Sequence, residues 1–171
     1  DGHAVTMGGR EVRLARHGFA RKQEWKLEEQ SDNMVALSLS SADHAELLEQ
    51  YPYPFKIVAR YTIDAAKVAV SYEVTNEGTE DMPFFVGGHP GFKCPLDEGE
   101  SYDDYELRFE QREAAELCTA VPSTGLIDVE HRSKNPMIGQ NLPLTHELFD
   151  FAETIFDVLE SRVVTLTKKT E

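Results

Sequence analysis

Two segments of the sequence combine a histidine with glycines and aromatic residues, a setting suited to acid–base chemistry on a small polar ligand. Residues 16–21 read Arg-His-Gly-Phe-Ala-Arg, and residues 84–92 read Phe-Phe-Val-Gly-Gly-His-Pro-Gly-Phe. An imidazole gains or loses a proton near neutral pH, so it can serve as a general acid or base. Glycine lets the backbone approach a ligand closely, and an aromatic ring offers an apolar platform for the C–H face of a sugar.

His89 is the stronger of the two candidates. The apolar residues 83–86 before it predict a short strand, and a rigid strand would position the side chain that follows. Pro90 then stiffens the turn. The alternative for His17 and His89 is a surface or packed histidine without a role in chemistry. The other histidines lie in polar or turn-like contexts without ligand spacing, so we expect no metal site.

The elements that must position these segments are strands. Residues 56–63 are rich in β-branched residues, and residues 67–75 alternate, with Val68, Val70 and Tyr72 on one side and polar residues on the other. Alternation with a period of two predicts a strand with one buried and one solvated face. The short link at residues 64–66 predicts an antiparallel hairpin.

Further strands are expected at residues 34–40, 105–110 and 162–169, separated by turn clusters rich in Gly, Pro, Asn and Asp. One helix of about two turns is expected at residues 42–50, with Ser41 as its N-cap. Many short strands with little helix indicate an all-β protein, an antiparallel β-sandwich.

The composition excludes several classes of function. Acidic residues number 31 against 17 basic ones, a formal net charge of −14, so we expect no nucleic-acid partner. No apolar run is long enough to span a membrane, and no signal peptide is visible, which favours a cytoplasmic protein. Cys94 and Cys118 do not form a C-x-x-C pair and are expected to be buried or half-buried thiols, with a single bridge between them as the alternative.

Several motifs in order resemble the galactose mutarotase-like superfamily, and in particular its bacterial aldose 1-epimerase branch. These are His-Gly-Phe-Ala-Arg at 17–21, Tyr-Pro-Tyr-Pro-Phe at 51–55, Val-Ser-Tyr-Glu-Val-Thr-Asn at 70–76, Gly-His-Pro-Gly-Phe at 88–92 and Leu-Phe-Asp at 148–150. The resemblance extends from about residue 9 to residue 169. It implies a large antiparallel β-sandwich that needs no metal or organic cofactor.

The resemblance also implies roles for individual residues. His89 would protonate the ring oxygen of the sugar, His17 and Arg21 would bind sugar hydroxyls, and Phe92 would line the pocket. The activity implied is interconversion of the α and β anomers of a free aldohexose such as glucose or galactose. Such a reaction needs an acid at the ring oxygen and a base at the C1 hydroxyl.

The chain departs from the superfamily pattern in two places. The general base of the superfamily is a Glu near the C-terminus, beyond the segments that match here, so we expect residues 1–171 to form a single partial β-sandwich domain with little activity of its own. Relatives tend to carry a ligand-binding Asp near the position of Ala152. Either Glu153 takes that role or it is a solvated loop carboxylate.

Three alternatives to a mutarotase of free sugars remain at this point. A hexose-6-phosphate 1-epimerase would need more basic residues near the site than Arg16, Arg21 and Lys22. A non-catalytic carbohydrate-binding protein on the same fold would lack the base. In a purely structural sandwich, His17 and His89 would not be neighbours. The sequence predicts neither the preferred sugar nor the oligomeric state.

Overall fold

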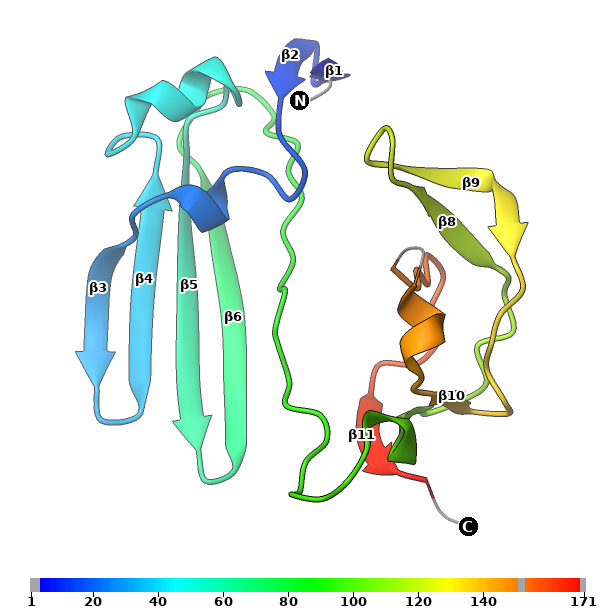
Figure 1. Cartoon of the computed structure of the whole chain (residues 1–171). Coiled ribbons are helices and arrows are strands. Elements are labelled where there is room, and N and C mark those ends of the chain that lie inside the picture. Colours follow the sequence, from blue (N-terminus) through cyan, green and yellow to red (C-terminus); the bar gives the residue numbers. More distant parts are fainter. Residues whose placement is uncertain (1–3, 151–152, 170–171) are drawn as a thin grey trace. The chain divides into compact units, whose positions relative to one another are not determined.

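The computed structural model describes residues 4–150 and 153–169, and its strands pair only in antiparallel fashion (Figure 1). The all-β class is therefore confirmed. Helical structure in the described residues is limited to 3₁₀ turns of three to five residues. The chain divides into two compact units, unit 1 (residues 1–88) and unit 2 (residues 89–171), and each is described by itself. The expectation of a single domain over 1–171 stays a prediction.

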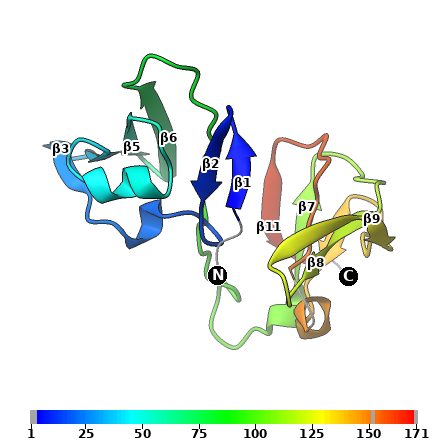
Figure 2. The same ribbon diagram turned by 90° about the horizontal axis from the view of Figure 1, so that it is seen from above.

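Unit 1 is built on a four-stranded sheet in the order β3-β4-β5-β6. These strands are β3 (Lys26–Ser31), β4 (Met34–Ser40), β5 (Phe55–Asp64) and β6 (Lys67–Asn76). Asp64 pairs with Lys67, so β5 and β6 form the predicted hairpin, and Ala65 in the turn takes a φ of 49°. A second hairpin, β1 (Ala4–Met7) with β2 (Arg10–Arg13), is seen in Figure 2.

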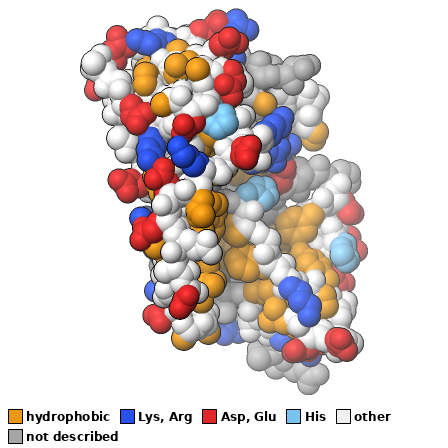
Figure 3. All heavy atoms as spheres, turned by 90° about the vertical axis from the view of Figure 1, so that its left-hand side faces the viewer, with side chains coloured by type: hydrophobic (Ala, Val, Ile, Leu, Met, Phe, Trp, Pro, Cys, Tyr) orange, Lys and Arg blue, Asp and Glu red, His pale blue; other side chains and the backbone are white. Residues whose placement is uncertain are grey.

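The predicted buried face of residues 67–75 is only partly buried. The register pairs Ile57 with Val74 and Ala59 with Tyr72, and it places Val70 and Val68 further along the same face. Val74 is half-buried, whereas Val68 is 64% exposed. The hydrophobic core of unit 1 contacts the sheet near Phe55 and Ile57, at the opposite end, so the far ends of β5 and β6 extend beyond it. Figure 3 shows hydrophobic side chains lying between charged ones on one face of the protein.

The core of unit 1 lies between the sheet and the segments before and after β4. Its buried members are Val12, Leu39, Leu47, Tyr51, Tyr53 and Phe55. The helix expected at residues 42–50 was wrong. Residues Ala45–Glu49 form a 3₁₀ turn that buries Leu47 completely. Ser41 caps no helix, because its hydroxyl oxygen instead accepts the N–H of Phe55 at 3.0 Å.

The short strand expected at residues 83–86 is also absent. This segment runs without ladder pairing in the described part of the chain (Figure 1). A strand exists only where a neighbour completes its hydrogen bonds. In its sheet, β6 pairs with β5 along one edge, and no described strand pairs with its other edge. The premise that His89 follows a rigid strand was therefore wrong, and the role of His89 as the acid stays a prediction.

Unit 2 contains two small sheets. Its strand β7 (Tyr105–Phe109) lies between β10 (Asn141–Pro143) and β11 (Val164–Lys168), and β8 (Leu117–Val121) pairs with β9 (Leu126–Ser133). The strands expected at 105–110 and 162–169 are confirmed with slightly shorter bounds. Cys94 and Cys118 are free thiols, half-buried and buried respectively.

Candidate functional site

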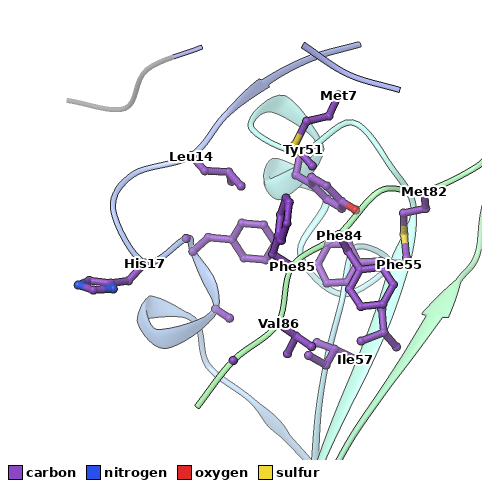
Figure 4. Close-up of a pocket in the computed structure, with 15 residues that line it drawn as sticks. Met7, Leu14, His17, Tyr51, Phe55, Ile57, Met82, Phe84, Phe85 and Val86 are labelled. Atoms are coloured by element: carbon purple, nitrogen blue, oxygen red, sulfur yellow. The ribbon is translucent and has the colours of Figure 1, made fainter. Parts of the chain in front are cut away.

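An apolar pocket of about 210 Å³ lies within unit 1, beside the first histidine segment (Figure 4). The lining comes from residues 7–20, 51–57 and 82–87. Val74 of β6, which pairs with Ile57, also contributes to it. Five aromatic side chains contribute to it, namely Phe19, Tyr51, Phe55, Phe84 and Phe85. An apolar, aromatic surface with a polar group at its edge is the usual construction of a small-molecule site.

His17 lies at the rim of this pocket. It takes a φ of 67°, and Gly18 follows with a φ of 68°. Two consecutive left-handed residues turn the chain sharply, and the N–H of Gly18 donates to the carbonyl of Ala15 at 2.8 Å. Figure 4 shows the imidazole pointing away from the aromatic side chains. A left-handed histidine is an uncommon, strained conformation of the kind that occurs at binding sites, so the outlier supports a functional reading of this turn.

Arg21 lies one turn further along, in the 3₁₀ turn η1 (Ala20–Lys22), and its side chain is exposed. The indole of the half-buried Trp25 donates to the carbonyl of Ala20 at 2.9 Å. Phe19, between the two polar residues, packs against Phe55 with 5.5 Å between ring centroids. The segment is therefore anchored by its apolar residues, which leaves the polar groups of His17 and Arg21 on the outside.

Two tyrosine hydroxyl groups form hydrogen bonds to segments that line the pocket. The Tyr51 hydroxyl donates to the carbonyl of Pro83 at 2.8 Å, and the Tyr53 hydroxyl donates to the carbonyl of Met7 at 2.5 Å. Burial raises the pKa of Tyr51 to about 12, so this hydroxyl keeps its proton at neutral pH and remains a donor. Both bonds tie pocket-lining segments to the buried core.

His89 and Phe92 belong to unit 2, and both are exposed, Phe92 by 80%. The structure thus places His17 and Arg21 in unit 1, and His89 and Phe92 in unit 2. Their convergence on one ligand stays a prediction. Glu153 is exposed. Ala152, the position at which relatives were expected to carry an Asp, lies outside the described residues.

Two further features follow from the described part of the chain. Within it, no three His, Cys, Asp or Glu side chains gather as metal ligands. None of the helices there is long and apolar enough to cross a membrane.

Sequence reasoning missed Tyr51, Phe55 and Met82 as pocket residues. A signal for the first two was present in Tyr-Pro-Tyr-Pro-Phe at 51–55, because prolines at alternate positions favour extended chain. In an extended chain, residues 51, 53 and 55 point to the same side. Met82 carries no signal in the sequence, since it is one apolar residue among polar and proline neighbours.

The chain is similar to known proteins along most of its length. It is 40% identical over 157 residues to the plasmid and chromosomal LacX proteins of Lactococcus lactis subsp. lactis, an alignment that covers 91% of this chain and 52% of theirs. Its structure superimposes on that of a galactose mutarotase-like protein from Lactobacillus casei with a TM-score of 0.81 at 27% identity, covering 96% of this chain and 55% of the other.

A galactose mutarotase related enzyme from Lactobacillus acidophilus superimposes with a TM-score of 0.72, also at 27% identity, over 87% of this chain and 48% of the other. The fold is therefore galactose mutarotase-like, and the chain spans about half the length of the relatives it matches. The sequence profile of the family described as aldose 1-epimerase matches residues 1–171, the entire chain. This chain belongs to the aldose 1-epimerase family.

Proposed function

We propose that the complete protein is a cytoplasmic mutarotase that interconverts the α and β anomers of a free aldohexose, glucose- or galactose-like, with His89 as the general acid. The observation that carries this proposal is the family match over the entire chain. The aromatic pocket beside His17 and Arg21 supports it, because such a pocket can receive the C–H face of a pyranose while polar groups at the rim meet its hydroxyls.

The chemistry assigns each proposed residue a task. A proton from His89 reaches the ring oxygen, the bond between that oxygen and C1 breaks, and a base takes the proton of the C1 hydroxyl to give the open-chain aldehyde. Rotation about C1–C2 presents the other carbonyl face, and the reverse steps close the ring as the other anomer. His17 and Arg21 hold hydroxyl groups, Arg21 through its fixed fork of N–H donors. Phe92 adds apolar contact with the ring.

The base in this proposal is a glutamate outside residues 1–171, as the superfamily resemblance implies. A positioned acid and a positioned base each contribute on the order of 10²–10⁴-fold to such a rate. The present chain alone should therefore catalyse mutarotation weakly, and the full-length protein strongly. If the chain alone reached the full rate, the base would lie within it, and Glu153 would be the first residue to replace.

The test is polarimetry of freshly dissolved α-D-glucose or α-D-galactose with the full-length protein. His89→Asn should lower kcat by about 100-fold or more, because the acid is lost while an exposed loop residue contributes little to folding. His131→Asn is a matched control, since His131 is also an exposed histidine of unit 2, with its Nδ1 2.9 Å from a carboxylate oxygen of Asp128. Near wild-type rates for His89→Asn would remove it as the acid.

The same preparation separates the alternatives. A hexose-phosphate epimerase would act on α-glucose 6-phosphate at a higher kcat/KM than on α-glucose. A non-catalytic binding protein would bind sugar in calorimetry and leave the rate of mutarotation at its background value. Either result would replace the function proposed here.

A further inference from the structure

Tyr51 contacts the first histidine segment and also Pro83, the residue immediately before the second segment. Its ring packs against Phe19, with 6.1 Å between centroids, two residues after His17. Its hydroxyl donates to the carbonyl of Pro83, immediately before the aromatic pair Phe84 and Phe85. The side chain itself is buried, with 6% of its surface exposed. It thus links the two walls of the pocket (Figure 4).

The ring of Tyr51 is held firmly. It lies 5.2 Å from the ring of Tyr53 and 5.8 Å from that of Phe55, both of them buried. Close-packed interiors leave little room for such a ring to move. The position of the hydroxyl is therefore set by the core, and the Pro83 carbonyl takes its position from the hydroxyl.

The segment that Tyr51 holds is poorly supported after Pro83. Before it, the amide of Asn76 donates to the carbonyl of Glu80 at 2.7 Å, and Arg10 is ion-paired with Glu80. After it, residues 84–88 carry no ladder pairing in the described part of the chain, and Phe85 is 94% exposed. The Tyr51 hydrogen bond is thus the last anchor before the aromatic wall begins.

We propose that Tyr51 is a positioning residue that sets the distance between the His17 turn and the Phe84–Val86 wall, and thereby the affinity of the pocket for a sugar ring. This inference rests on the proposed function for its link to sugar, and on unit 1 alone for its geometry. The hydroxyl, rather than the ring, is the active feature, because a phenylalanine at this position would fill the same core volume without reaching Pro83.

The first test is kinetic and uses the full-length protein. Tyr51→Phe should raise KM for α-D-glucose by about 3–10-fold, the usual consequence of one lost hydrogen bond, and should leave kcat within about twofold, since no reacting atom is contacted. Ser38→Ala is the control: it removes the hydrogen bond of a buried hydroxyl of unit 1, to Glu28 at 2.7 Å, at a residue that does not line the pocket. Its KM should stay within about twofold. Equal changes in KM would mean general loosening of the core and would overturn the inference.

The second test needs no activity. With 4-fluorophenylalanine incorporated at Phe84, the ¹⁹F resonance of the free protein should shift or broaden in Tyr51→Phe and stay as in the wild type in Ser38→Ala. An unchanged resonance in Tyr51→Phe would overturn the inference whether or not the protein is a mutarotase. A changed resonance in a protein without mutarotation or sugar binding would uphold the positioning role and overturn the proposed function instead.

Discussion

The two units hold themselves together in different ways. Unit 1 has a core of apolar and aromatic side chains, and the pKa of Glu28 there is lowered by a hydrogen bond from Ser38 and an ion pair with Lys56. In unit 2, five carboxyl groups have lowered pKa values, with a hydrogen bond to the carboxylate as the leading cause in each. They are Glu100, Glu113, Asp128, Glu147 and Asp157.

These carboxylates of unit 2 hold its loops to one another. Glu113, 4% exposed, accepts the N–H groups of Glu160 at 3.1 Å and Ser161 at 2.8 Å. Arg132 reaches across from β9 and bonds both carboxylate oxygens of Asp157, at 2.9 and 2.8 Å. Hydrogen bonds to acidic side chains therefore help to stabilise unit 2, whereas the packing of aromatic rings stabilises unit 1. The two units should respond differently to lost apolar volume and to acid.

The largest expected effect is the loss of core volume in unit 1. Leu47→Ala should lower the free energy of unfolding by about 2–5 kcal/mol, because Leu47 is fully buried among the aromatic rings. Leu27→Ala, at a position 55% exposed on β3, should change it by less than about 0.5 kcal/mol. Urea unfolding followed by fluorescence of Trp25, the single tryptophan, measures both, because Trp25 lies in unit 1. Similar values for both variants would contradict an apolar core at this place.

The next effect separates the units by pH. A carboxyl group whose folded pKa is lowered stabilises the fold above its ordinary pKa, here 4.5 for Glu113, and that contribution is lost as the pH falls through the folded value. Since five such groups help to hold unit 2, whereas apolar packing holds the core of unit 1, acid should unfold unit 2 first. Circular dichroism, which follows all strands, should begin to change below about pH 4.5, and at a higher pH than the fluorescence of Trp25. Coincident transitions would mean that the units unfold as one.

A single substitution sharpens this result. Glu113→Gln should lower the midpoint of thermal unfolding by a few degrees at pH 7, because a neutral amide oxygen accepts the two N–H groups more weakly than a carboxylate. The difference from the wild type should shrink as the pH falls through the lowered pKa of Glu113, because the wild-type carboxyl then also becomes neutral. Glu130→Gln, on the exposed part of β9, is the control and should show no difference at either pH. A difference that persisted in acid would point to packing rather than charge.

The smallest effects are expected from the loss of one ion pair in each unit. Arg60→Gln removes the exposed pair with Glu29 in unit 1 and should cost about 0–1 kcal/mol. Arg132→Gln should cost more, because it breaks two bonds to Asp157 and a third to the carbonyl of Glu116 at 2.9 Å. Chemical unfolding of both variants at two salt concentrations checks the order, with the Arg60 effect fading in salt. The reverse order would contradict the contrast between the units.

The strands were the most predictable part of this protein. The expected residues 34–40 are β4 without change, and 56–63 and 67–75 differ from β5 and β6 by a residue at one or both ends. Alternation and β-branched residues act through the local backbone, so they can be read from neighbouring positions. The predictions for residues 42–50 and 83–86 were wrong because the structure there depends on partners that are distant in the sequence. Ser41 found a partner 14 residues away in Phe55, and residues 83–86 found no neighbour for a ladder.

The candidate site divides in the same way. The sequence by itself determined the class of fold, the family and the two histidine segments, because these depend on residue types in a fixed order along the chain. Tertiary structure decided which apolar residues are buried, since Ala59 and Tyr61 lie on the same face of β5 yet are 3% and 38% exposed. It also made Tyr51 the link between two segments more than 60 residues apart. Burial and such links depend on which elements meet in space, and local periodicity carries no information about that.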